Sequence, residues 1–181
     1  MHTIAIGCDP NAARLKDELI AHLRRQGYPV TDMGSDDVIY PNTAARVARA
    51  VAAGEYDRGI LLCGTGLGMS IAANKVRGAY AALISDCYSA ERARRSNNAN
   101  IACIGAFTVG SALAKKLADT FLTSEYTPGT PSEPKVAKIV ELDEERGRNI
   151  RETYLIRLPQ RLRMWPCSSN ASCAASIRRL N

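Results

Sequence analysis

Histidine is nearly absent from this chain, whose 181 residues contain only His2 and His22. A histidine-based metal site or a Ser-His-Asp relay needs histidine on the loops of a site, so both are excluded. No CxxC pair occurs among the six cysteines, and Cys8, Cys63 and Cys103 each lie at or near the end of an apolar run. We therefore expect reduced thiols, with neither a bound metal nor a disulfide framework.

Long apolar runs and a secretion signal are also missing. No stretch approaches the roughly 18 apolar residues that a membrane helix needs, and the first residues lack a basic segment followed by a cleavage site. With 46% hydrophobic and 23% charged residues, the composition is that of a folded domain. The chain is therefore predicted to be cytoplasmic, with no membrane partner.

The net charge of +6 is placed unevenly along the chain. Residues 1–146 carry 17 Lys and Arg against 17 Asp and Glu, whereas residues 147–181 carry seven arginines and one glutamate. A basic excess confined to a terminal segment is weak support for nucleic-acid binding, which calls for a basic face on the folded part. We predict no nucleic-acid partner, a neutral domain over 1–146 and a basic C-terminal tail over 147–181.

Apolar runs and helical periods alternate along the domain. The patterns predict strands over 3–7, 29–32, 59–63, 79–84 and 100–104, and helices over 11–26, 42–53, 67–74, 88–95, 110–123 and 135–145, with a linker over 128–134. Asn42 is the expected cap of the second helix. The apolar strand 59–63 is typical of a sheet covered on both sides. This alternation predicts an α/β fold, a doubly wound five-stranded parallel sheet with helices on both faces.

Ligands of such sheets bind beyond the carboxyl ends of the strands, where the segment Cys63–Ser70 reads CGTGLGMS. Its glycines, Gly64, Gly66 and Gly68, permit a tight turn that leaves backbone N–H groups uncovered at a helix N-terminus. The GxGxxG and P-loop patterns of nucleotide sites are missing. We interpret the segment as an anion cradle beside a thiol whose pKa the helix lowers from about 8.5. A purely structural turn after a buried cysteine is the alternative.

Other polar residues follow the same strands or precede them. Asp9 and Tyr40 are expected at the same edge, although a helix cap and a packing role explain them equally well. The run Ser96-Asn97-Asn98-Ala99-Asn100 places four polar side chains before an apolar strand. A left-handed asparagine at a helix end accounts for one of them. The remaining amides suit recognition of a polyhydroxylated ligand.

Together these segments resemble the RpiB/LacAB sugar-phosphate isomerases. The resemblance rests on Gly7-Cys8-Asp9, Tyr40-Pro41, Cys63–Gly68 with Ile71–Lys75, and Asn97–Asn100 with Gly105. It extends from residue 3 to about residue 146. It implies a Rossmann-like α/β sandwich and an aldose–ketose isomerase that needs no cofactor. It also implies a homodimer in which two subunits build each active site, with a tetramer as the alternative.

The resemblance also implies roles for single residues. Cys63 corresponds to the catalytic base, which moves a proton between C1 and C2 of the open-chain sugar through a cis-enediol(ate). Thr65 and the N–H groups of Gly64–Gly68 correspond to the cradle that stabilises the enediolate oxygen. Asp9 and Tyr40 correspond to positions that contact the substrate, and Asp9 is included among the catalytic candidates.

Several positions depart from the family pattern. Asn97 corresponds to an asparagine from the partner subunit, but the ring-opening histidine expected before it is Ser96. The histidine expected after Asp9 is Pro10, and the phosphate-binding arginine expected after Gly105-Ala106 is Phe107. The Arg-His of the linker is absent as well, which leaves Lys135 as the nearest cation.

The predicted function is that of a ribose-5-phosphate isomerase of type B, which converts ribose 5-phosphate to ribulose 5-phosphate. Because Ser96 is a poor ring-opening group, a four-carbon sugar phosphate that cannot cyclise is an alternative substrate. A non-catalytic sugar-phosphate-binding protein is a second alternative, but it would need only the cradle and not Cys63. Lys138 and Arg14 join Lys135 as candidate ligands of the phosphate group.

Overall fold

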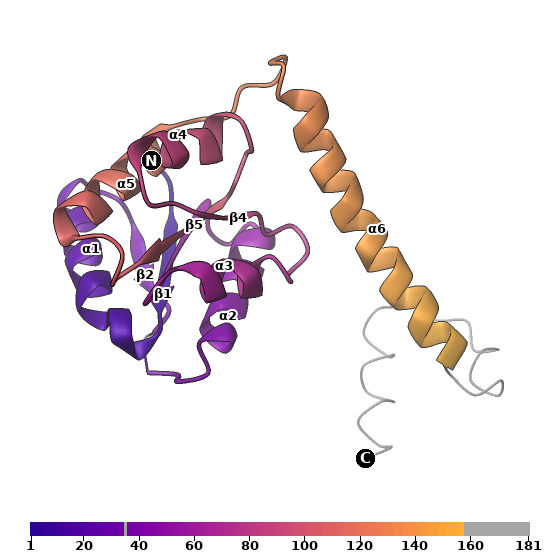
Figure 1. The fold of residues 1–181 in the computed structure, drawn as a ribbon, viewed down its shortest axis with the longest axis horizontal. Helices are drawn as coiled ribbons and strands as arrows, with labels where there is room; N and C mark the ends of the chain where they lie inside the picture. Colours follow the sequence, from indigo (N-terminus) through magenta and orange to yellow (C-terminus); the bar gives the residue numbers. More distant parts are fainter. Residues whose placement is uncertain (35, 158–181) are drawn as a thin grey trace. The chain divides into compact units, whose positions relative to one another are not determined.

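A parallel sheet forms the centre of the fold. The computed structural model describes residues 1–34 and 36–157, with side chains through residue 145. Met1–Asp143 form one compact unit, and Glu144 begins a second. In the first unit the strands lie in the order β2-β1-β3-β5-β4, and every neighbouring pair is parallel (Figure 1). They are β1 (Ile4–Cys8), β2 (Val30–Asp32), β3 (Arg58–Cys63), β4 (Ala81–Leu83) and β5 (Ile101–Gly105). The predicted five-stranded parallel sheet is confirmed.

Helices cover both faces of this sheet. The covering helices are α1 (Ala13–Arg25), α2 (Tyr40–Ala52), α3 (Leu67–Ala73), α4 (Cys87–Arg95) and α5 (Ser111–Thr123), and a 3-10 turn (Pro10–Ala12) precedes α1. The last described helix, α6 (Glu133–Arg157), follows α5 in the sequence and contributes no residue to the core described next. Residues of α1, α4 and α5 share one buried apolar cluster with the sheet, and residues of α2 and α3 share the other. The predicted doubly wound arrangement is therefore confirmed (Figure 1).

The central strand β3 shows why this fold needs an apolar strand. Ile60 and Leu62 point into the cluster under α1 and α5, whereas Leu61 and Cys63 point into the cluster under α2 and α3. All four are at most 6% exposed. Successive side chains of a strand alternate between faces, so a strand covered on both sides is apolar at every position. The last of these residues, Cys63, ends β3 at the carboxyl edge of the sheet.

The start of the second helix was predicted wrongly. Helix α2 begins at Tyr40, so Asn42 lies in its first turn and is not its cap. Pro41 fits this first turn because its φ is already helical and a missing N–H costs nothing there. Asn42 instead donates its Nδ2 hydrogen to Asp37 Oδ2 over 3.0 Å. This earlier start places Tyr40 on a helix rather than at the end of a loop.

The last helix extends well past its predicted end. Helix α6 spans Glu133–Arg157, whereas the pattern predicted 135–145 after a linker through 134. Pro134 is its second residue, a position that tolerates proline. Gly147 costs about 1 kcal/mol relative to alanine inside a helix but does not end it. The described helices contain none that is long and apolar enough to cross a membrane.

Candidate active site

The carboxyl edge of the sheet brings the first predicted site residues together. Cys63 pairs in register with Gly105 of β5, and the Asp9 amide donates to the Leu62 carbonyl over 3.0 Å. Asp9 therefore lies one strand away from Cys63. Its carboxylate accepts the Asn11 N–H at 2.8 Å and so caps the 3-10 turn. The capping role of Asp9 is therefore confirmed. The residue is only 7% exposed, and its role toward a substrate remains a prediction.

The glycine-rich turn holds the Cys63 sulfur in place. The Gly66 amide donates to Cys63 Sγ over 3.0 Å, and the Leu67 amide donates to Thr65 Oγ1 over 3.4 Å. Two of the amides predicted for the oxyanion cradle are therefore engaged inside the turn. The exposed Thr65 hydroxyl accepts this long bond, and its own hydrogen remains available to donate to a substrate oxygen.

Gly66 is essential to this turn. Its φ of +79° lies in the left-handed region, and a Cβ there would come within 2.5 Å of Leu83 Cδ1 and 3.1 Å of the Ile104 carbonyl carbon. We expect Gly66→Ala to lower the free energy of unfolding by about 1–3 kcal/mol and to displace the amide that binds Cys63 Sγ. Urea unfolding and steady-state kinetics measure the two effects.

A matched control separates backbone strain from damage to the site. Gly54 has a φ of +77° with open space around its Cβ position, and it follows α2 away from the carboxyl edge. Gly54→Ala should lower stability through backbone strain alone and leave kcat unchanged. If Gly66→Ala retained wild-type kcat, the turn would have no role in positioning Cys63.

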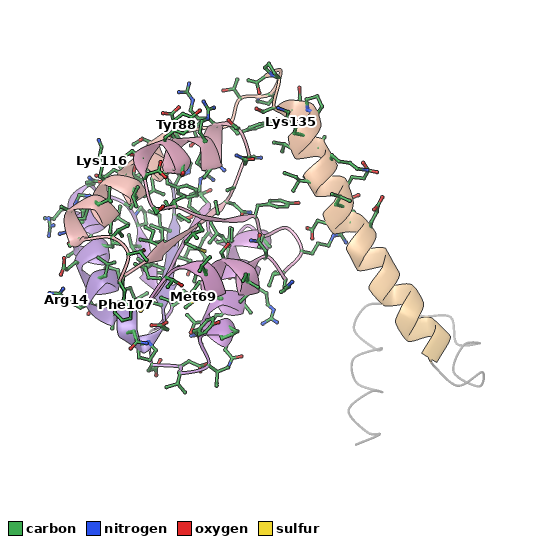
Figure 2. All side chains as sticks on the ribbon, viewed as in Figure 1. Arg14, Met69, Tyr88, Phe107, Lys116 and Lys135 are labelled. Carbon is green, nitrogen blue, oxygen red and sulfur yellow. The ribbon has the colours of Figure 1, made fainter. Side chains whose placement is uncertain are left out.

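Two aromatic side chains pack against the glycine-rich turn. A Cβ on Gly68 would lie 2.3 Å from the Tyr40 hydroxyl, so the absence of a side chain there permits Tyr40 to contact α3 closely. A Cβ on Gly64 would lie 3.0 Å from the ring of Phe107, whose amide donates to the Gly64 carbonyl over 2.9 Å. The structure thus places Tyr40 at the predicted site and adds Phe107, which is 74% exposed, as an apolar wall (Figure 2).

The other two buried cysteines of the described residues, Cys8 and Cys103, lie in surroundings that differ from those of Cys63. Burial raises the pKa of Cys8 to about 12, although Lys16 nearby acts in the opposite direction. Burial also raises the pKa of Cys103, which is completely enclosed by the sheet and its helices. Both thiols remain protonated at neutral pH. Among the buried cysteines in the described residues, Cys63 is the one whose sulfur accepts a hydrogen bond from a glycine-rich turn.

The polar run after α4 lies at the opposite edge of the sheet. Asn100 precedes β5, and its carbonyl accepts from the Gly59 amide at the beginning of β3. From Gly59 to Cys63 the strand rises about 13 Å, at about 3.3 Å per residue. Ser96 and Asn97, which end α4 before this point, therefore do not join Cys63 within one chain.

The asparagines of this run also bind their own backbone. Asn98 adopts the left-handed conformation at φ 49°, as predicted for one member of the run. Asn100 bonds the Tyr80 amide and the Gly78 carbonyl, and Asn97 Nδ2 donates to the Arg92 carbonyl over 2.9 Å. These amides thus have structural roles in the chain, which weakens the interpretation of the run as a ligand site by itself.

The last predicted residue, Lys135, lies exposed near the start of α6 (Figure 2). No cluster of three His, Cys, Asp or Glu that could hold a metal occurs among the described residues. The candidate site at the carboxyl edge comprises Asp9, Tyr40, Cys63 and Thr65 with the glycine-rich turn. It offers a fixed sulfur, a hydroxyl donor and a nearby carboxylate, the groups that proton transfer next to a carbonyl requires.

Comparison with known proteins assigns the chain to a family. A sequence model described as Ribose/Galactose Isomerase matches residues 4–139. The chain belongs to this family. It is 48% identical over 145 residues to the ribose-5-P isomerase B of Listeria innocua, a match that covers 78% of this chain and 97% of that protein. The predicted family is confirmed, and with it the predicted class of enzyme, an aldose–ketose isomerase of sugar phosphates.

Two further relatives bear on fold and specificity. The D-erythrulose-4-phosphate isomerase of Pectobacterium atrosepticum is 47% identical over 143 residues, covering 77% of this chain and 93% of that protein. The structure of Clostridium thermocellum ribose-5-phosphate isomerase B superposes with a TM-score of 0.75 at 42% identity, covering 80% of this chain and 99% of that one. The family match ends within the predicted domain of residues 1–146, whose boundary remains a prediction.

Proposed function

We propose that this isomerase moves a proton between C1 and C2 of an open-chain sugar phosphate, with Cys63 as the base. The observation that carries the proposal is the Cys63 sulfur, fixed at the end of β3 by the Gly66 amide at 3.0 Å. A base held this way needs little reorganisation before it removes a proton next to a carbonyl. The resulting cis-enediolate returns the proton to the neighbouring carbon, which converts aldose to ketose.

The neighbouring residues have complementary roles in this proposal. The Thr65 hydroxyl donates to the oxygen that becomes negative in the enediolate, because preorganised donors stabilise developing charge. Tyr40 and Asp9 bind hydroxyl groups of the sugar at the same edge. No metal or cofactor enters this sequence of steps.

We further propose that each site is shared by two subunits, with Ser96 and Asn97 supplied by the partner. Four large apolar side chains around the carboxyl edge are exposed in the single chain, namely Leu67, Ile71, Leu83 and Phe107, at 40–74%. Exposed apolar residues that cluster in this way are typical of an interface. A second copy seated there would cover them and bring its own α4 end to Cys63.

For the substrate we propose ribose 5-phosphate, with ribulose 5-phosphate as the product. Several relatives bear the name ribose-5-phosphate isomerase B, including the Escherichia coli protein at 43% identity over 150 residues. The free state of the described cysteines fits the cytoplasmic location that the sequence predicts. A screen of four-, five- and six-carbon aldose and ketose phosphates by NMR tests the proposal. Absence of turnover with every one would favour a non-catalytic binding protein.

A specific observation favours a second substrate, the four-carbon erythrulose 4-phosphate. Ser96 stands where the family resemblance places a ring-opening histidine, and a serine hydroxyl transfers protons poorly at neutral pH. Ribose 5-phosphate is mainly cyclic, whereas erythrulose 4-phosphate has no ring to open. The Pectobacterium relative at 47% identity is named for this four-carbon substrate.

Ser96→His distinguishes the two substrates. If the serine reflects a four-carbon substrate, the wild type should have the higher kcat/KM for erythrulose 4-phosphate. Ser96→His should then raise kcat/KM for ribose 5-phosphate by roughly tenfold or more, part of the effect, about 100-fold or larger, that a fully positioned acid–base group typically supplies. Steady-state kinetics with both sugar phosphates make the measurement. A clear preference of the wild type for ribose 5-phosphate would rule out the four-carbon substrate.

A further inference from the structure

An arginine-lined cavity lies along α4, away from Cys63 of the same chain. It has a volume of about 630 Å³ and opens beside Tyr88, which Figure 2 shows far from Phe107. The residues that matter for its chemistry are Arg92 and Arg95 of α4 with Ser96, the residue that follows this helix, and Thr127, Thr130 and Ser132 of the segment between α5 and α6. Arg92 and Arg95 follow Tyr88 by four and seven residues, a spacing that places all three on one side of a helix.

The charged side chains around this cavity, which we call the α4 cavity, leave an excess of one positive charge. Glu91 accepts from Arg95 at 3.2 Å and lies 3.7 Å from Arg92. Glu125 lies between Arg58 at 3.0 Å and Arg94 at 3.2 Å. Glu133 accepts from the Gly129 amide, beside the lining, at 2.9 Å. Four guanidinium groups in and next to the lining are thus set against three carboxylates. A phosphate monoester carries a charge of about −1.5 to −2 at pH 7 and is attracted by this positive excess.

Two buried donors of the lining residues have no hydrogen-bond partner in the described part of the chain, as is also true of Arg58 Nε and Arg94 Nε nearby. Arg92 Nε and Thr130 Oγ1 are enclosed, yet neither has a hydrogen-bond partner among the described residues. Buried polar atoms are rarely left unpaired, so each such atom calls for a reason. A phosphate group has three terminal oxygens, and each of them accepts hydrogen bonds from donors of this kind. The α4 cavity therefore has the charge and the donors of a phosphate site.

We propose that Arg92 and Arg95 bind the phosphate group of the sugar substrate, an inference that rests on the proposed isomerase function. Ser96 lines the α4 cavity and is also the residue that we expect at the active site of the partner subunit. A sugar with its reacting carbons at the partner subunit's Cys63 would then extend its phosphate along α4. This assignment explains how the enzyme works with Phe107 where the family resemblance places a phosphate-binding arginine.

The proposal is tested by replacing both arginines in the full chain. Arg92→Gln and Arg95→Gln should each raise KM by about tenfold, and the double variant by about 100-fold, while kcat falls less than threefold, since hydrogen bonds to a charged group contribute strongly to binding. The probes are ribose 5-phosphate and erythrulose 4-phosphate. Arg25→Gln, at an exposed arginine on α1, is the matched control and should leave KM unchanged.

A second measurement needs no turnover. Calorimetric titration with inorganic phosphate should show binding to the wild type that weakens at least tenfold in the double variant. If the wild type isomerises neither sugar phosphate, the proposed function fails, and this titration alone decides whether the α4 cavity binds phosphate.

Three results would overturn the assignment. The first is a lowered melting temperature with unchanged KM, since arginines in the last turn of α4 also stabilise a helix terminus. The second is loss of phosphate binding without a change in KM, which would mean a site separate from the substrate. The third is an equal or larger rise in KM for Arg14→Gln, which would place the phosphate beside α1 instead.

Discussion

Cys63→Ser is expected to lower kcat by at least about 100-fold, the lower range for loss of general acid–base catalysis. The substitution keeps the size of the side chain and its place at the end of β3, but a serine hydroxyl gives up its proton at a far higher pH than a thiol. KM should change little, because Tyr40, Asp9 and the glycine-rich turn remain. Steady-state kinetics by NMR or by a coupled assay measure the effect.

Two controls accompany this variant. Cys87→Ser changes an exposed thiol at the start of α4 and should retain wild-type kcat. Thermal unfolding of Cys63→Ser should differ from the wild type by only a few degrees, because one small buried group replaces another. Near-normal turnover by Cys63→Ser would remove this thiol from the mechanism.

Mixing two inactive variants should restore activity. If Cys63 of one subunit works with Asn97 of the other, then Cys63→Ser and Asn97→Ala each disable both sites of a homodimer. A heterodimer of the two variants has one intact site and one site that carries both changes. Random assembly of equal amounts therefore recovers about a quarter of the wild-type activity, as expected for a symmetric dimer that exchanges its chains.

The complementation experiment requires exchange of subunits. Co-refolding of the two variants from denaturant, with separately refolded samples mixed afterwards as the control, measures the recovered activity. Activity well above the sum of the separate variants supports the shared site. If Asn97→Ala alone kept its activity, Asn97 would have no role at the site. If the mixture recovered nothing while heterodimers formed, the site would not combine Cys63 of one chain with Asn97 of the other.

Much of the fold could be predicted because burial leaves a clear pattern in the sequence. β3 and β5 are apolar at nearly every position, as strands covered on both faces must be. The boundaries of α6 were harder, since Pro134 and Gly147 usually mark helix ends. Proline is tolerated in a first turn, and a single glycine inside a long helix costs only about 1 kcal/mol. Local patterns therefore placed the elements better than they placed their ends.

The glycine-rich turn of the candidate site was predictable, because its special backbone conformation involves residues that are neighbours in the sequence. The left-handed Gly66 and the sulfur three residues before it belong to one turn, so the sequence CGTG was informative. Contacts across the fold leave no such local signal. Nothing in the sequence places the Tyr40 hydroxyl against Gly68, since this contact depends on how α2 packs on α3.

The α4 cavity was missed for a related reason. The spacing of Tyr88, Arg92 and Arg95 indicates one side of a helix, but arginines in a last helical turn are also typical of ordinary capping. Only the arrangement of α4 against the segment 127–132 turns this side into the wall of a cavity. The net charge of residues 1–146 is zero, so it gives no indication of a local group of arginines.

Proton transfer through Cys63 is tested most directly by the fate of the transferred hydrogen. The enzyme is incubated in D₂O with whichever of ribose 5-phosphate and erythrulose 4-phosphate it turns over faster, and the product is followed by ¹H NMR. A thiol that removes the proton exchanges it with solvent, so we predict deuterium on the carbon that receives it. Deuterium incorporation should disappear together with turnover in Cys63→Ser. Full turnover with no deuterium in the product would contradict the solvent exchange that this mechanism predicts.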